Sequence, residues 1–130
     1  MLSYQRKDVM KNNEISWKAG KTIYNFNDDS DFAYLLKDGE VEIKSQNGVR
    51  IGYINKDEVF GEQSILLGTK RTVHALATKD SIAYKIPKQN LLKEYHDSSM
   101  FIQAILRSTY IRLTNLGSTI KDNLQSIDNT

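Results

Sequence analysis

The sequence has no cysteine and a single proline among its 130 residues. The lack of cysteine excludes a disulfide framework and a metal site built from thiolates. Its apolar runs are short, and none approaches the roughly 18 residues that a membrane-spanning helix needs. The N-terminus lacks the apolar segment of a signal peptide. These absences predict a cytoplasmic protein that has no contact with a membrane.

An excess of one charge is also missing, because 18 basic residues face 16 acidic ones. A net charge of +2 is too small to indicate direct binding to nucleic acid. His74 and His96 are too far apart in sequence to predict a metal site. Neither a P-loop nor a nucleophile elbow occurs. We therefore expect no enzymatic activity, no metal and no cofactor.

Residues 14–86 show short β-prone runs separated by turn signals, the pattern of an all-β domain. Val41 and Ile43 alternate with charged residues, which indicates a strand with one buried face. Asn47-Gly48 is the signal of a type I′ hairpin turn. Even spacing of strands without helices between them predicts a β-roll of the double-stranded β-helix or jelly-roll type. The expected strands are 15–17, 22–26, 32–36, 40–44, 49–54, 72–77 and 82–86.

Helices are expected on both sides of this roll, so the predicted fold class is mainly β with flanking helices. Residues 1–13 suit a short N-terminal helix, and Pro87 suits the first turn of a helix over 87–96. A longer helix is predicted over 99–125. The length of 130 residues fits one domain with a modest core.

The long helix carries a heptad seam, in which apolar residues recur in alternating steps of four and three. Its positions are Ile102, Leu106, Thr109, Leu113, Leu116, Ile120, Asn123 and Ile127, with Thr109 and Asn123 as two polar interruptions. One interpretation is a single amphipathic helix that packs on its own domain. The other is a homodimer that pairs two such helices. A seam of this length is hard to bury on a small roll, so we favour the homodimer.

The segment from Phe60 to Ala75 combines residue types that suit one small anion that also carries a hydroxyl group. Gly61 lets the backbone approach a phosphate closely, and the helical turn after it points free N–H groups at an anion. Arg71 can grip a phosphodiester with two N–H groups at once. Glu62 can accept from a sugar hydroxyl, and Ser64 and Thr72 are small donors.

This segment resembles the phosphate-binding cassette of the cyclic nucleotide-binding domain family. The family pattern is Phe-Gly-Glu-Leu/Ile-Ala-Leu, a short spacer, and Arg-Ala/Ser/Thr-Ala. The resemblance covers the chain from about residue 16 onward. Four positions differ: Gln63 replaces an apolar residue, Ser64 replaces Ala, Lys70 replaces a frequent Pro and Val73 replaces Ala.

The resemblance implies a role for each residue of the cassette. Glu62 is similar to the family's acceptor of the ribose 2′-hydroxyl, and Arg71 to its arginine on the cyclic phosphate. The backbone of Gly61, Gln63 and Ser64 is similar to its amide cradle. Thr72 falls where a hydroxyl touches phosphate or base, and Val73 shapes the pocket. Tyr110, Thr114 or Asn115 of the C-terminal helix would cover the base.

The resemblance therefore implies a sensor of cyclic AMP or cyclic GMP, with cyclic AMP slightly favoured. Bound ligand would reposition the C-terminal helix, and a separate, unidentified protein would read the altered dimer. The alternative is a ligand-free structural module of the same fold that acts through dimerisation, with Glu62 and Arg71 paired at the mouth of an empty roll. A cyclic nucleotide hydrolase fits poorly, because the usual metal-binding His/Asp set is missing.

Overall fold

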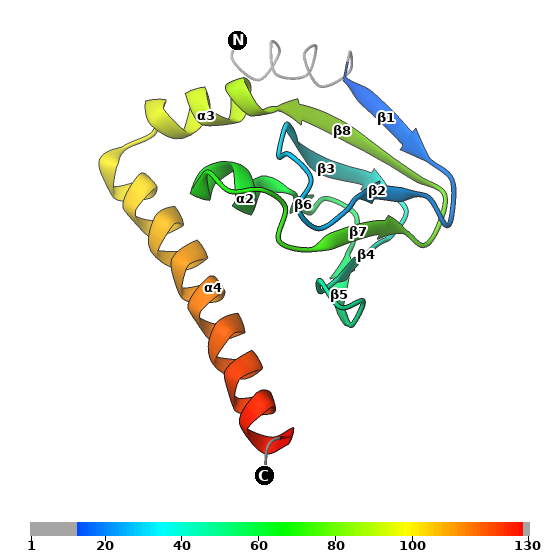
Figure 1. The fold of residues 1–130 in the computed structure, drawn as a ribbon. Helices are drawn as coiled ribbons and strands as arrows, with labels where there is room; N and C mark the ends of the chain where they lie inside the picture. The colour runs from blue at the N-terminus through cyan, green and yellow to red at the C-terminus, as the bar shows by residue number, and fades with distance from the viewer. Residues whose placement is uncertain (1–12, 129–130) are drawn as a thin grey trace. The chain divides into compact units, whose positions relative to one another are not determined.

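The structure is a computed structural model that describes residues 13–128. Within this range the chain forms two four-stranded antiparallel sheets and three helices (Figure 1). The first sheet has the order β1 (Glu14–Trp17), β8 (Ser81–Pro87), β3 (Phe32–Asp38), β6 (Val59–Phe60). The second has the order β2 (Thr22–Tyr24), β7 (His74–Ala77), β4 (Val41–Lys44), β5 (Arg50–Ile54). The predicted fold class, a β-roll with flanking helices, is confirmed.

The helices are α2 (Glu62–Leu67), α3 (Lys88–Asp97) and α4 (Met100–Asp128). The chain divides into two units, one up to Lys93 with both sheets and α2, the other from Glu94 with the end of α3 and all of α4. The predicted N-terminal helix falls on residues 1–12 and Asn13, of which only Asn13 is described. None of the described helices is both long and apolar enough to cross a membrane.

Two local predictions in the roll need correction. Pro87 is the last residue of β8, paired with Phe32, and α3 begins one residue later. The reason is that Lys88 N–H donates to the Asp31 carbonyl, which continues the β3–β8 ladder past Pro87 and keeps the proline in the strand. The β4–β5 connection is not a type I′ turn either, because that turn needs positive φ at both central residues and here Gly48 alone has it.

Ser45 and Val49 form the last backbone-paired residues of the β4–β5 hairpin, and the loop between them has three residues instead of two. Gly48 N–H donates to the Ser45 carbonyl at 2.9 Å, and Ser45 N–H donates to the Val49 carbonyl at 2.8 Å. This is the hairpin in which a glycine with left-handed φ, here 84°, follows a tight turn. The Ser45 side chain also accepts from Val49 N–H at 3.1 Å, and this bond favours the longer loop.

The core between the sheets is built around four aromatic rings. Trp17 meets Tyr34 edge-on with ring centroids 5.2 Å apart, and Tyr34 stacks on Phe60 at 5.2 Å. Phe60 in turn stacks on Tyr24 at 6.4 Å. Small and aliphatic residues fill the remaining space, namely Leu36, Val41, Ala75, Ala77 and Ala83. Because Tyr24 belongs to the second sheet and the other three rings to the first, the rings join the two sheets.

The second unit begins at a tight corner between α3 and α4. Ser99 caps α4 by accepting from Ile102 N–H at 3.1 Å. The Gln103 side chain donates to the carbonyls of His96 and Ser98, which closes the corner. Along α4 the seam residues Ile102 and Leu113 are 46% and 51% exposed. The predicted seam residues from Ile102 to Ile127 lie on α4, and the seam as a pairing surface stays a prediction.

Burial changes the acidity of Tyr24, which is 8% exposed. Desolvation raises the pKa of its phenol from 10.0 to about 12, and the nearby Arg71 guanidinium lowers it by a smaller amount. The pKa of this phenol is higher in the folded protein than in the unfolded chain. Its contribution to the free energy of unfolding is therefore fully present below pH 10 and is lost as the pH rises through 12.

Replacing Tyr24 with Phe should remove this loss. From the two pKa values, the parent should lose about 1.4 kcal/mol of unfolding free energy between pH 9 and pH 11 through this phenol. Urea unfolding at both pH values measures the loss, with Tyr53→Phe as control, because Tyr53 is 40% exposed. An equal loss in the parent and in Tyr24→Phe would show that Tyr24 ionises as readily in the fold as in water.

Candidate functional site

Two glycines fix the six-residue helix α2 at its ends. Gly61 precedes it with φ 78°, and Gly68 follows it with φ 70°, both left-handed values that glycine adopts without strain. After the helix, Gly68 N–H donates to the Ile65 carbonyl and Thr69 N–H to the Ser64 carbonyl, the pair of bonds called a Schellman motif. The N-terminal end of a helix carries the positive end of its dipole, so this end can face an anion.

The backbone of Arg71 is held by the loop after β2. Asn27 N–H donates to the Arg71 carbonyl at 2.8 Å, and Arg71 N–H donates to the Asp28 carbonyl at 2.9 Å. Asn27 has φ 72°, a left-handed value that asparagine tolerates better than most residues. This pair of bonds sets the position from which the Arg71 side chain enters the roll.

The Arg71 side chain is buried, with 4% of its surface exposed. Its Nη1 donates to the Gly61 carbonyl at 2.6 Å and to Ser64 Oγ at 3.1 Å, and its Nη2 donates to the Phe32 carbonyl. All three acceptors are uncharged. A Cβ on Gly61 would lie 2.9 Å from Nη1, so a larger residue here would force the guanidinium to shift.

The buried guanidinium keeps donors for a further acceptor. Arginine has five N–H donors, and the three bonds above use both of Nη1 and one of Nη2. Nε is buried and has no hydrogen-bond partner. A buried cation held only by neutral groups, with an unpaired N–H, fits an oxyanion that accepts two hydrogen bonds at once.

The Tyr24 ring packs against the Arg71 guanidinium. The centre of the guanidinium lies 4.1 Å from the centroid of the Tyr24 ring, within the range of a cation–π contact. Because Tyr24 stacks on Phe60, the aromatic core reaches directly to the arginine. Tyr24 was not predicted as a site residue, because its only local signal in the sequence is a large ring in a short strand.

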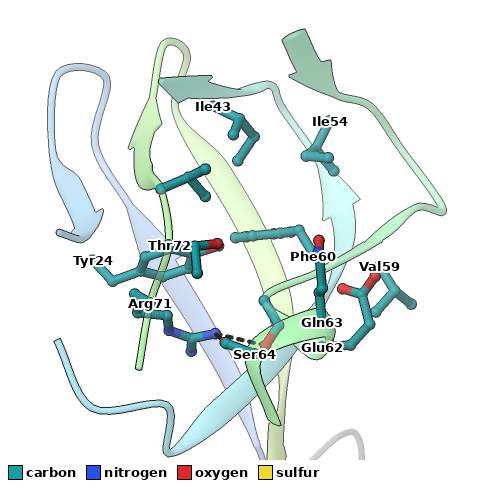
Figure 2. Close-up of a pocket in the computed structure, with 12 residues that line it drawn as sticks. Tyr24, Ile43, Ile54, Val59, Phe60, Glu62, Gln63, Ser64, Arg71 and Thr72 are labelled. Atoms are coloured by element: carbon teal, nitrogen blue, oxygen red, sulfur yellow. Dashed lines mark hydrogen bonds between the residues drawn. The ribbon is translucent and has the colours of Figure 1, made fainter. Parts of the chain in front are cut away.

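A pocket of about 150 Å³ opens beside Arg71 in the first unit (Figure 2). It brings together seven of the predicted site residues: Gly61, Glu62, Gln63, Ser64, Arg71, Thr72 and Val73. The rest of the lining is mostly apolar: Phe60, the first residue of the predicted cassette, and four residues that were not predicted, Tyr24, Ile43, Ile54 and Val59. Pockets for whole drug-sized ligands usually exceed about 300 Å³, so this space suits part of a nucleotide.

The polar groups of the pocket differ in burial. Ser64 is 6% exposed, Glu62 and Gln63 are half-buried, and Thr72 is exposed. Figure 2 shows the Arg71 guanidinium directed toward the Ser64 oxygen, at the start of α2. The pocket thus joins one buried cation, one carboxylate and the first turn of a helix, which together fit an anion bearing a hydroxyl group.

The remaining predicted site residues, Tyr110, Thr114 and Asn115, lie on α4 in the second unit. Their place over a base stays a prediction. His74 has a structural role, since its Nδ1 accepts from Phe26 N–H at 3.0 Å.

Solved structures share this fold. The EAL enzyme Bd1971 in its cAMP-bound form is 22% identical with a TM-score of 0.72, over 83% of this chain and 30% of that one. Its cGMP-bound form is 21% identical with a TM-score of 0.74, over 86% of this chain and 31% of that one. A transcriptional regulator from Thermotoga maritima is 17% identical with a TM-score of 0.65, over 88% of this chain and 94% of that one.

This chain therefore spans less than a third of the Bd1971 chain. No curated protein sequence matches it. The model of the cyclic nucleotide-binding domain, however, matches residues 14–98, which include both sheets, α2 and α3. The chain belongs to the cyclic nucleotide-binding domain family.

Proposed function

We propose that the chain is a cytoplasmic, non-catalytic sensor of a cyclic nucleotide, with cyclic AMP slightly preferred over cyclic GMP. The observation that carries this proposal is the Arg71 guanidinium, which is 4% exposed, held by neutral acceptors and unpaired at Nε. A cyclic phosphate brings one negative charge and two non-bridging oxygens, enough to pair the donors that Arg71 keeps. The binding of cAMP and cGMP by Bd1971 supports the ligand class.

The remaining pocket residues fit the rest of the ligand. Glu62 begins α2 and lines the same pocket as Arg71. A carboxylate beside a phosphate is unfavourable unless it accepts from a donor, and a ribose 2′-hydroxyl is such a donor. The apolar side chains of Ile43 and Ile54 line the pocket and suit the carbon skeleton of the sugar. The base would lie beyond this space, under Tyr110, Thr114 or Asn115.

The signalling step is a shift between two placements of α4. The ligand would draw α2 toward the phosphate, and α4 would follow and cover the base. The seam of α4 would pair with that of a second copy, and a separate protein would read the altered dimer. The exposed Ile102 and Leu113 support this pairing, since burying each such side chain is worth roughly 1.5–3 kcal/mol.

Arg71→Ala should weaken the binding of cyclic AMP and cyclic GMP by ~2–5 kcal/mol, the usual result of removing one partner of a buried charged pair. Arg71→Lys should recover part of this, because an ammonium makes no planar fork. Calorimetric titration with each nucleotide measures both. The matched control is Lys70→Ala, which removes a neighbouring but 62% exposed cation. Unchanged affinity in a folded Arg71→Ala protein would refute the assignment of the phosphate site.

Glu62→Gln should weaken cyclic AMP binding by ~1–3 kcal/mol, because a hydrogen bond to a charged acceptor is lost. The test repeats the titration with 2′-deoxy cyclic AMP. This analogue should bind the parent weakly and lose little more affinity in Glu62→Gln. If the mutation costs as much with the deoxy analogue as with cyclic AMP, Glu62 does not contact the 2′-hydroxyl.

The double variant Leu113→Glu and Leu116→Glu should give a folded monomer by sedimentation, since it places four carboxylates in one paired seam. Ala104→Glu with Ser108→Glu adds the same charge away from the seam and should leave a dimer. Ligand affinity should fall in the monomer only if α4 also covers the pocket. A parent protein that is monomeric at tens of micromolar would rule out the dimer, whatever its affinity for cyclic nucleotides.

A further inference from the structure

Two buried serines lie beside the arginine of the proposed phosphate site. Ser30 and Ser64 are 7% and 6% exposed, and their hydroxyl oxygens are 2.8 Å apart. Ser30 comes from the loop before β3, and Ser64 from the first turn of α2. Ser64 stands where the family pattern has alanine, so its hydroxyl is an addition to that pattern.

The number of protons limits the hydrogen bonds of this pair to two arrangements, and in the first of them Ser30 donates to Ser64. Ser30 Oγ donates to Ser64 Oγ, and Arg71 Nη1 donates to Ser64 Oγ at 3.1 Å. A hydroxyl has two acceptor lone pairs and one proton. With both lone pairs of Ser64 occupied by incoming donors, its own proton points to a third group. Ser64 lines the pocket, so a ligand bound there is within the set of groups that can accept this proton.

Ser30 also has a second acceptor, because its oxygen lies 3.0 Å from the Thr69 carbonyl oxygen. Its single proton therefore serves either Ser64 or Thr69. When Ser30 donates to Thr69, Ser64 can donate back to Ser30, and every hydroxyl in the pair is satisfied without a ligand. When an anion arrives, rotation of the two hydroxyl protons frees Ser64 to donate into the pocket.

The neighbours of Ser64 make it a strong donor. A hydroxyl that accepts from a cation is polarised, and its O–H bond donates more strongly to the next acceptor. The charge of Arg71 would therefore act on the phosphate in two ways, by direct attraction and by making the Ser64 hydroxyl a stronger donor. Two separate donors, the guanidinium and the hydroxyl, would then meet the two non-bridging oxygens of one phosphate.

We propose that Ser64 binds the ligand phosphate through its side-chain hydroxyl, and that Ser30 is the positioning residue that orients this hydroxyl. The proposal rests on the proposed function, since it needs a phosphate held by Arg71. It adds a side-chain contact to the backbone cradle. A purely structural role would instead have the two serines hold Arg71 and the end of α2 in place, with no contact to ligand.

The test uses calorimetry with cyclic AMP and with its two phosphorothioate diastereomers, in which sulfur replaces one non-bridging oxygen at a time. Ser64→Ala should weaken cyclic AMP binding about 10- to 100-fold, and Ser30→Ala about 2- to 10-fold. Adding Ser30→Ala to Ser64→Ala should change affinity by less than about twofold, because Ser30 acts through Ser64. Since sulfur accepts hydrogen bonds weakly, Ser64→Ala should also change the affinity ratio of the two diastereomers.

The matched control is Ser81→Ala. Ser81 is 2% exposed, accepts from Glu40 N–H and does not line the pocket. This variant should lower the urea midpoint of unfolding and leave cyclic AMP affinity and the diastereomer ratio as in the parent.

The outcomes separate this proposal from the proposed function. If the parent binds cyclic AMP and Ser64→Ala matches it in affinity and in diastereomer ratio, the hydroxyl contact is refuted while the sensor stands. If Ser64→Ala loses affinity equally for both diastereomers, Ser64 only positions Arg71, and the contact is again refuted. If the parent binds no cyclic nucleotide, the proposed function fails and this contact fails with it.

Discussion

The first unit depends on the burial of one positive charge. Taking a guanidinium out of water costs several kcal/mol unless neighbouring dipoles replace the lost hydration. For Arg71 these neighbours come from separate parts of the chain: the Gly61 carbonyl before α2, the Phe32 carbonyl of β3, and the Tyr24 ring of β2. Each must be in place for the charge to be tolerated, so the arginine ties the cassette to both sheets.

The aromatic core connects the buried Arg71 guanidinium to the rest of the roll. Tyr24 touches Arg71 on one face and stacks on Phe60, which stacks on Tyr34. Rings packed in this way gain energy from their geometry as well as from buried area. Tyr24 and Phe60 therefore both stabilise the fold and help to position the Arg71 guanidinium. A substitution that shifts one of these rings would also shift the guanidinium in the pocket.

Local patterns were sufficient to predict the fold class and the composition of the cassette. Gly61 and Arg71 were predictable as pocket residues from properties of a single residue, glycine's missing Cβ and arginine's planar fork, and their contacts with a phosphate stay predictions. Tyr24 and Ser30 were not, because each meets its partner only through folding: Ser30 is 34 residues from Ser64. The Asn-Gly pair predicted the wrong turn for a related reason, since Ser45 pairs with Val49, four residues on, and Asn47 does not take the positive φ of a type I′ turn.

The shortness of α2 has a consequence for how the site responds. Isolated helices of fewer than about 12 residues are not stable in water, so six residues stay helical only through their flanking contacts. Those contacts are the two left-handed glycines, the buried Ile65 side chain and the bonds of Ser64 to Ser30 and Arg71. The order of this helix therefore depends on residues outside it, and Arg71, which lies beyond its C-terminal end, is one of them.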